Sequence, residues 1–326
     1  MMELVFLLDM IVFTVIGGYI FTSVVLFKYP HLLHRRKQLK FPCRHISHRG
    51  GAAEGLENTL ATFQRAVDLG TDILELDVQL SKDGQVVVSH DNDLQRCSGV
   101  NSSISDLNYD ELPPLKPAQS VDFSNGLVCP TSEDRRIPLL KDVFARFPST
   151  PMNIDVKTDR DELIDKVNKL IVEFKREDIT IWGSFYHRVA QKCYKANPNV
   201  PLFFSAVGVV YLIILTYTGL LPFINIKYSC LEIILPSVAI KNPMVRQTSF
   251  LMRSIVLLKL IDWFLVKKFL LDHLWKRGIP TYLWVINDKE GFQQAFNLGA
   301  AGVMTDRPTL LQEFLQENPH VGRTGT

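Results

Sequence analysis

Eight short apolar runs recur along the sequence after residue 44, and amphipathic stretches separate most of them. This alternation is typical of repeated βα units, which build a parallel sheet. Eight such units close a single barrel, and a barrel of this kind commonly fills about 250 residues. We therefore predict an α/β fold, a TIM (β/α)8 barrel, with strands at residues 45–49, 72–78, 152–157, 179–183, 202–206, 231–235, 281–286 and 302–305.

Turn signals agree with this order of elements. The amphipathic segments 59–69 and 269–277 end at Gly70 and Gly278, and each glycine suits the left-handed residue that closes a helix. A turn at 81–84 leads into a short returning strand at 85–89. Residues 91–137 are rich in Asn, Ser, Pro and Asp without clear periodicity, so we predict a loop-rich insertion that caps one face of the barrel.

The N-terminal segment 3–27 is apolar and is interrupted chiefly by Asp9. About 20 apolar residues suffice to cross a bilayer. A cleaved signal peptide begins with basic residues, whereas here the bases follow the apolar run, at Lys28, Arg35, Arg36, Lys37 and Lys40. We therefore predict that residues 1–40 are an uncleaved transmembrane anchor with a basic flank, which places the following chain in the cytoplasm. A buried helix is the alternative.

A second apolar stretch, residues 202–224, raises the same question. If it crossed the bilayer, Trp284 would lie on the opposite side from His48 and His90, and one barrel could not close. We therefore expect residues 207–225 to be an apolar insert that dips into the membrane, helped by Tyr211 and Phe223. Apolar length alone does not separate this interpretation from an ordinary buried helix.

The overall charge and the cysteines narrow the classes of function. Lys and Arg total 36 against 34 for Asp and Glu, so no global basic field indicates a nucleic-acid partner. The five cysteines are scattered without C-x-x-C spacing, which is typical of reduced structural thiols in a cytosol-facing domain. Nothing in the sequence indicates an obligate protein partner, and the residues from 318 to 326 are expected to form a flexible tail.

Ionisable residues gather where the predicted strands end, which is the active-site end of a barrel. Glu75 and Asp77 are two residues apart on a strand, so both carboxylates point to one face. Two carboxylates that share an interior repel each other unless a cation neutralises them, and a hard divalent metal is the simplest such cation. Asp155 lies at the end of the third strand and can complete an oxygen-rich site.

Positive side chains accompany these carboxylates. Arg49 and Lys157 offer a bidentate fork and a point charge for a phosphate group. The glycines after Arg49 leave its backbone open to a bound anion. The alternative is that Arg49 and Lys157 pair with Glu75 and Asp77 in a buried ion-pair network that needs no metal.

Two histidines, His48 and His90, occupy corresponding ends of separate strands. Histidine titrates near neutral pH, so the pair could serve as general acid and general base on opposite sides of one substrate. Each could instead ligate a metal. His90 is the candidate for both roles, because its strand returns beside Glu75 and Asp77.

Several of these segments resemble one known family. The motifs HISHRG, GLENTLATFQRAVDLGTDILELDVQLSKDGQVVVSHD, MNIDVK, YLWVIND and AGVMTDRP resemble the glycerophosphodiester phosphodiesterase family over about residues 43–315. The resemblance implies His48 and His90 as acid and base, Arg49 and Lys157 as phosphate contacts, and Glu75, Asp77 and Asp155 as ligands of Mg²⁺ or Ca²⁺. It also implies that Trp284 lines the substrate pocket, where an outer barrel position is the alternative. The family commonly has Glu where this chain has Asp155, so ligation there could be water-mediated or pass partly to His90.

The anchor and the apolar insert make the chain most similar to the membrane-bound lysophospholipase D branch of that family. This similarity implies lysophospholipid substrates, with lysophosphatidic acid as product, and a membrane location in the endoplasmic reticulum. Water-soluble glycerophosphodiesters and a catalytically silent lipid-binding protein remain alternatives. We accordingly divide the chain into an anchor, residues 1–40, a barrel, residues 41–317, and a tail.

Overall fold

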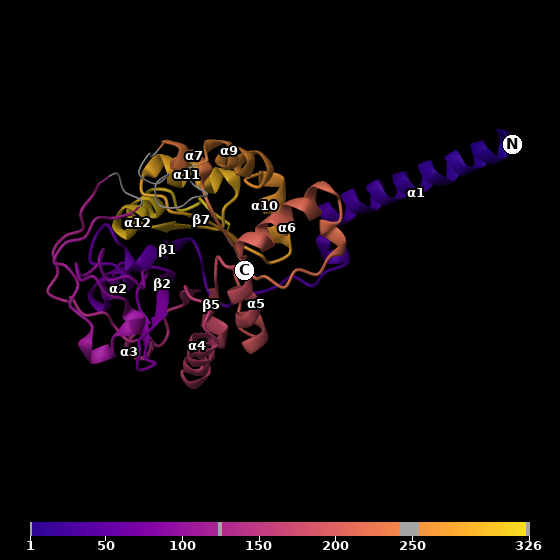
Figure 1. Cartoon of the computed structure of the whole chain (residues 1–326). Helices are drawn as coiled ribbons and strands as arrows, with labels where there is room; N and C mark the ends of the chain where they lie inside the picture. The colour runs from indigo at the N-terminus through magenta and orange to yellow at the C-terminus, as the bar shows by residue number, and fades with distance from the viewer. Residues whose placement is uncertain (1, 123–125, 242–253, 324–326) are drawn as a thin grey trace.

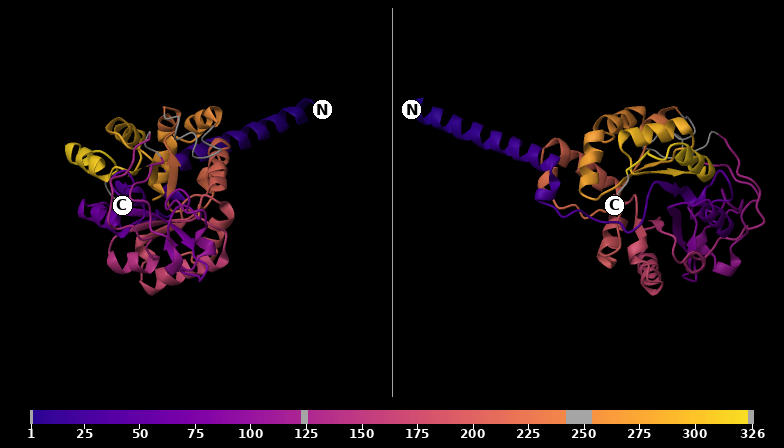
Figure 2. Two further views of the ribbon diagram at one scale, coloured as in Figure 1. Left: turned by 60° about the vertical axis from the view of Figure 1, so that its left-hand side comes forward. Right: turned by 180° about the vertical axis from the view of Figure 1, so that it is seen from behind.

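The computed structural model describes residues 2–122, 126–241 and 254–323. A barrel of parallel strands surrounded by helices forms the body of the molecule, and one long N-terminal helix projects from it (Figures 1 and 2). The segments expected as strands and helices therefore assemble into the predicted α/β barrel.

Among the described residues, seven parallel strands lie in the order β5-β4-β2-β1-β8-β7-β6. The fifth predicted strand, at 202–206, is reduced to two parallel bridges, from Leu202 to Trp182 on β5 and from Phe203 to Cys230 beside β6. These bridges close the ring between β5 and β6. The strands are β1 (His45–Ser47), β2 (Ile73–Leu80), β4 (Met152–Val156), β5 (Thr180–Gly183), β6 (Leu231–Ile234), β7 (Thr281–Trp284) and β8 (Gly302–Thr305).

Two local details differ from a plain βα repeat. The first strand was expected to continue to Arg49 but ends at Ser47, because His48–Gly50 turns in a short 3-10 helix with Arg49 at φ 50°. The predicted returning strand is present as β3 (Val86–Val88), which pairs antiparallel with β2. It ends two residues before His90, so that the histidine lies beside the end of β2.

Side chains alternate along the strands between the helices and the barrel interior. Leu74, Leu76 and Val78 of β2 face outward into the large core beneath the helices. The inward-facing Ile73, Ile181, Phe203 and Tyr282 fill the base of the barrel. The interior is therefore packed at its base, and the polar residues of β2 and β4 lie nearer the carboxyl ends of the strands.

Helices cover the outside of the barrel (Figure 1). They are α2 (Leu60–Asp68), α3 (Leu140–Arg146), α4 (Asp161–Glu173), α5 (His187–Ala196), α6 (Ala206–Tyr217), α7 (Pro236–Lys241), α9 (Ile255–Phe264), α10 (Lys268–Lys276), α11 (Lys289–Leu298) and α12 (Pro308–Glu317). Gly70 after α2 and Gly278 after α10 have φ values of 82° and 72°, as the sequence predicted. All five cysteines are buried and free, which agrees with structural thiols.

The insertion at 91–137 contains, among its described residues, only short 3-10 turns, η3 (Ile104–Asp106) and η4 (Tyr109–Glu111). It has an apolar cluster of its own, in which Leu94, Ile104 and Leu115 pack with Leu56 from the segment after β1. The loop-rich prediction is therefore confirmed. Its core holds the insertion against the rim next to the His48 turn.

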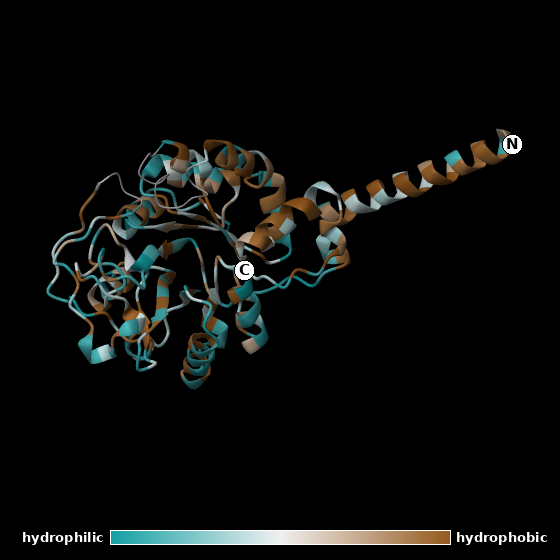
Figure 3. Ribbon diagram, viewed as in Figure 1, coloured by the Kyte–Doolittle hydropathy of each residue, from teal (hydrophilic) through white to brown (hydrophobic). Residues whose placement is uncertain are grey.

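The N-terminal helix α1 (Met2–Lys28) is the one helix in the described part of the chain that is long and apolar enough to cross a membrane. Almost all of its side chains are exposed, and it is apolar over nearly its whole length (Figure 3). After it, the short 3-10 helix η1 (Pro30–Leu32) leads to a segment under the barrel base, where Phe41 is buried and the Lys37 ammonium donates to the carbonyls of Lys227 and Tyr228. These contacts join the segment after α1 to the barrel.

The second apolar stretch forms α6 and the 3-10 helix η6 (Leu221–Phe223). Twelve residues of helix extend about 18 Å, well short of the roughly 30 Å of a bilayer core. Leu212 and Leu215 are buried against the barrel, whereas Val210, Ile214 and Tyr217 are exposed. This helix is therefore neither a membrane span nor an ordinary buried helix.

The tail expected from residue 318 makes defined contacts up to Arg323. The guanidinium of Arg323 donates to the carbonyl of Gly299 and pairs with Asp272, and Val321 packs on the large core. These contacts correct the expectation of a flexible tail for residues 318–323. Residues 324–326 lie outside the described residues.

Gly278 and Gly70 provide a matched test of how closely the segment that contains Lys37 packs against the barrel. Both are left-handed, but a Cβ on Gly278 would lie 1.9 Å from the Lys37 carbonyl oxygen, whereas a Cβ on Gly70 would meet nothing within 4 Å. We expect Gly70→Ala to lower the free energy of unfolding by about 1–2 kcal/mol, because alanine at this position pays only the cost of the left-handed backbone conformation. Gly278→Ala should lower it clearly further, measured by urea denaturation. Equal losses would contradict the close approach of the linker.

Candidate active site

The predicted site residues meet at the carboxyl ends of the strands. Glu75 and Asp77 lie on the inward face of β2, and Asp77 is in register with Asp155 on the neighbouring strand β4. His48 and Arg49 occupy the 3-10 turn after β1, and Lys157 follows β4 directly. Parallel strands bring these ends together at one mouth, which is where barrels carry their active sites.

The carboxyl groups of Glu75 and Asp77 are buried side by side, and their pKa values are shifted in opposite directions. Burial opposes the ionisation of Asp77, but Lys157, His90 and Arg49 outweigh it and hold its pKa well below the usual range. Burial and the negative charge of Asp77 together raise the pKa of Glu75. Neighbouring carboxyl groups whose pKa values are shifted in opposite directions are typical of functional sites.

Lysine and arginine form ion pairs with Asp77 in the structure. The Lys157 ammonium lies 2.7 Å from Asp77 Oδ1 and 2.6 Å from Asp155 Oδ2, and Arg49 Nε lies 3.5 Å from Asp77 Oδ2. The ion-pair alternative drawn from the sequence is thus present for Asp77. Within the described residues, no group of three His, Cys, Asp or Glu side chains is close enough to hold a metal ion as placed.

The donor set nevertheless fits a hard cation. Asp155 Oδ1 is buried and has no hydrogen-bond partner, so one carboxylate oxygen on the inward face of the barrel is unsatisfied. A buried orphan acceptor is costly without a cation or a donor. Together with Glu75 and Asp77 it supplies the all-oxygen ligands that Mg²⁺ and Ca²⁺ take. Lys157 would then share or yield its contacts with Asp77 and Asp155.

His48 is oriented by a chain of hydrogen bonds from the end of β8. Its Nδ1 lies 2.6 Å from Asp306 Oδ1, and Asp306 Oδ2 accepts from the Asn287 amide at 2.9 Å. Burial lowers the pKa of His48, but the carboxylates of Asp306 and Glu75 outweigh burial and raise it. The contact at Nδ1 places the other ring nitrogen, Nε2, 4.0 Å from Glu75 Oε2, toward the acidic pair.

His90 is held in a corresponding way. Its Nδ1 lies 2.7 Å from Asp91 Oδ1, and Asp91 in turn pairs with Arg96. The charge of His90 contributes to the lowered pKa values of Asp77 and Glu57, so the ring lies near both. Two histidines, each fixed through Nδ1 by an aspartate, therefore flank the acidic pair.

Arg49 contacts more carboxylates than the sequence indicated. Its guanidinium is buried and lies 3.0 Å from both Glu57 Oε2 and Asp122 Oδ2, in addition to its contact with Asp77. Its backbone N–H donates to Glu75 Oε2 at 2.8 Å. In this structure Arg49 thus positions carboxylates, and its predicted contact with phosphate stays a prediction.

Trp284 lies at the end of β7 and is half-buried. It packs both on the cluster inside the barrel and on a small cluster formed by Ile234, Ala239 and Leu258. The alternative of an outer barrel position is therefore wrong, because Trp284 shares the inward face with Tyr282. Its predicted contact with substrate remains a prediction.

Sequence reasoning missed most of the residues that hold the site together. Asp306, Asp91, Glu57 and Arg96 orient the two histidines and Arg49, and Asn58 Nδ2 donates to Asp77 Oδ2 at 3.1 Å. The signals were present, since Asp306 directly follows the last predicted strand and Asp91 directly follows His90. Glu232, which accepts from Asn153 at 2.9 Å inside the barrel, gave no such signal.

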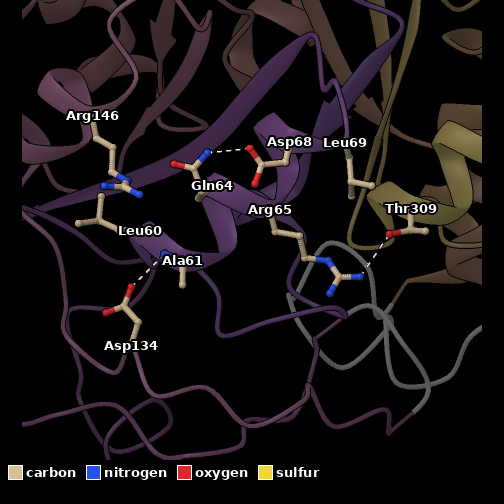
Figure 4. A pocket seen from close by; sticks show the side chains of 9 residues that line it. All are labelled: Leu60, Ala61, Gln64, Arg65, Asp68, Leu69, Asp134, Arg146 and Thr309. Carbon is tan, nitrogen blue, oxygen red and sulfur yellow. Dashed lines mark hydrogen bonds between the residues drawn. The ribbon is translucent and has the colours of Figure 1, made fainter.

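A surface pocket of about 800 Å³ lies elsewhere, between α2 and the start of α12 (Figure 4). It is lined by residues such as Gln64, Arg65, Asp134 and Thr309, several of which already bond to one another. It contains none of the predicted site residues.

Comparison with known proteins points to one family. The model of the glycerophosphoryl diester phosphodiesterase family matches residues 48–310. The chain is 49% identical over 304 residues to "Lysophospholipase D GDPD1" of Homo sapiens, covering 92% of this chain and 95% of that relative. It is 38% identical over 306 residues to "Lysophospholipase D GDPD3" of Mus musculus, covering 93% and 91%.

Solved structures agree on the fold. A putative glycerophosphoryl diester phosphodiesterase from Silicibacter pomeroyi matches with a TM-score of 0.65 at 17% identity, covering 88% of this chain and 97% of that one. At this identity the likeness supports the barrel fold alone.

Proposed function

This chain belongs to the glycerophosphoryl diester phosphodiesterase family and is a phosphoric diester hydrolase, and from that premise we propose that it is a lysophospholipase D. Its substrates are lysophosphatidylcholine, lysophosphatidylethanolamine and N-acyl lysophosphatidylethanolamine. Its products are lysophosphatidic acid and the head-group alcohol, or an N-acylethanolamine from the last substrate.

One observation carries the proposal. His48 and His90 are each held through Nδ1 by an aspartate, and they flank the same buried acidic pair at the mouth of the barrel. A histidine fixed in this way presents Nε2 for proton transfer. Two such groups on one site suit a reaction that needs a proton removed on one side and donated on the other.

The roles follow from this arrangement. One histidine takes the proton from the sn-2 hydroxyl of the lysophospholipid, whose oxygen attacks phosphorus. The other histidine protonates the head-group oxygen as its bond to phosphorus breaks. A water molecule then opens the cyclic phosphate, and the two histidines exchange roles. A free sn-2 hydroxyl explains a preference for lysophospholipids over diacyl lipids.

Positively charged side chains stabilise the phosphate group during these reaction steps. Lys157 and Arg49 neutralise its oxygens, and Trp284 contacts the organic part of the substrate beside them. Glu75, Asp77 and Asp155 would hold a divalent cation, Mg²⁺ or Ca²⁺, with His90 as a further candidate ligand. Bound there, the cation supplies charge that stabilises the phosphate oxygens and acidifies the hydroxyl.

The membrane provides the substrate. We propose that α1 is an uncleaved anchor, that the barrel faces the cytoplasm, and that the membrane is that of the endoplasmic reticulum. An anchored barrel meets lipid substrates at a raised local concentration. No nucleic acid or obligate protein partner enters this account.

Replacing Asp306 with Asn is expected to lower kcat/KM by about 10- to 100-fold. An amide that donates to Nδ1 selects the wrong tautomer of His48, and the loss of the carboxylate removes a charge that raises the pKa of His48. The limb of kcat/KM against pH that reports His48 should move to lower pH. An unchanged rate and pH profile would show that Asp306 supports only the fold.

The substrate class is tested with the purified full-length protein in detergent. Lysophosphatidylcholine, N-acyl lysophosphatidylethanolamine and glycerophosphocholine are supplied separately with Mg²⁺, Ca²⁺ or a chelator, and products are quantified by mass spectrometry. We expect release from the two lipids that chelation abolishes. Turnover of glycerophosphocholine alone would instead assign water-soluble diesters. Folded protein without turnover of any substrate would support a silent lipid-binding protein.

A further inference from the structure

Two helices on the same side of the molecule expose apolar side chains that no described residue covers. On α6 these are Val207, Val210, Tyr211, Ile214 and Tyr217, and on α9 they are Ile255, Val256, Leu260 and Trp263. The helices come from different βα units, and both are rich in apolar residues (Figure 3). Soluble proteins rarely leave a continuous surface of this kind uncovered.

The ends of α6 and α9 meet each other, and the turn after α6 meets α1. Tyr217 at the end of α6 donates its hydroxyl to the carbonyl of Phe264 at the end of α9, at 2.9 Å, and their rings pack edge to face. The next two residues, Thr218 and Gly219, accept from Tyr19 and Ser23 of α1. The apolar surface is therefore continuous with the membrane-span candidate.

The register of these contacts sets the depth of α6. Tyr19 and Ser23 lie nine and five residues before Lys28, the first basic residue after the apolar run. At 1.5 Å per residue, the turn after α6 lies about 8–14 Å to the membrane side of that lysine. If α1 crosses a bilayer, this turn and the adjoining ends of α6 and α9 lie below the lipid head groups.

We propose that the outer faces of α6 and α9 dock on the bilayer beside α1, so that the barrel lies against the lipid surface and does not hang from a single anchor. The sequence 206–226 contains no charged residue, as insertion requires. In the sequence, Lys227 follows this uncharged stretch and Lys267 follows α9, while α9 itself contains Lys259 and one acidic residue, Asp262. Lys267 lies over the ring of Trp263 at 5.8 Å, and exposed Trp beside Lys is typical of a membrane interface.

Docking in this way would also place the mouth of the barrel close to lipid. The buried side of α9 contributes Leu258 to the cluster with Ile234 and Trp284 at the end of β6 and β7. One ten-residue helix, about 15 Å long, thus connects the membrane end at Trp263 with the rim of the site. This last consequence rests on the proposed function, whereas the docking surface does not.

The test uses full-length protein in lipid nanodiscs, with one cysteine introduced at Val210→Cys on α6 or at Leu260→Cys on α9. The native cysteines are buried, so an environment-sensitive fluorophore labels the new site. Val172→Cys on α4 is the matched control, because Val172 is 48% exposed against 56% and 47% for Val210 and Leu260. We expect a blue shift and quenching by brominated lipids at 210 and 260, and neither effect at 172.

A label-free measurement covers the case in which a labelled variant does not fold. Brominated lipids should quench part of the intrinsic fluorescence of the wild type, and Trp263→Phe should remove that part. Labels at 210 and 260 that respond to aqueous quencher as the label at 172 does would overturn the proposal. Protection from both quenchers, with cross-linking between chains through the new cysteines, would also overturn it and assign the surface to a second copy.

Discussion

His48→Asn should lower kcat/KM for lysophosphatidylcholine by about 10²- to 10⁴-fold, the contribution of a general acid or base. The asparagine amide can still donate to Asp306, so the buried carboxylate at 2.6 Å from Nδ1 keeps a partner. What is lost is the titrating ring nitrogen, Nε2, that lies toward Glu75. The effect is therefore expected in turnover and not in folding, and it is measured by initial rates and thermal melting together.

His320→Asn is the control for this change, because His320 is exposed and lies near the C-terminal end of the described chain. It should retain wild-type activity. If His48→Asn kept a rate within a few-fold of the wild type and an unchanged melting temperature, His48 would have no part in proton transfer.

Asp77→Asn is expected to destabilise the protein by roughly 3–5 kcal/mol as well as to inactivate it, because it removes one partner of a buried ion pair. Asp77 is ionised and contacts both Lys157 and Arg49, and its loss leaves Arg49 short of a partner and Lys157 with Asp155 alone. The loss is read from urea denaturation of the full-length protein in detergent.

Glu75→Gln separates stability from function at the same site. Burial and Asp77 raise the pKa of Glu75, which favours a neutral side chain at this position, so Glu75→Gln should change the free energy of unfolding less than Asp77→Asn does. Activity should still be lost if Glu75 is a metal ligand. Equal destabilisation by the two changes would contradict the assignment of the charge to Asp77.

The fold and the centre of the site could be predicted because their signals are local. Alternation along β2 places Glu75 and Asp77 on one face, and the eight apolar runs give the order of the barrel. The short fifth strand was harder, since only two bridges, at Leu202 and Phe203, close the ring. Two residues carry too little periodicity to fix the ends of a strand.

The residues that orient the site residues could not be predicted, because contacts between segments far apart in the sequence bring them into place. Asp306 is 258 residues from His48, and Arg49 takes Asp122 as a partner from the distant insertion. The apolar face of α9 was missed for a related reason. Its residues have ordinary amphipathic spacing, and only the contact of Phe264 with Tyr217 places them beside α6 and α1.

The central claim is that this hydrolase breaks the bond between phosphorus and the head-group oxygen of a lysophospholipid. Phosphorus NMR of lysophosphatidylcholine during incubation with the full-length protein tests it most directly. The account predicts that the diester signal is replaced by the monoester signal of lysophosphatidic acid while free choline is released. Appearance of phosphocholine and monoacylglycerol would contradict it, because the bond on the glycerol side would then be the one that breaks.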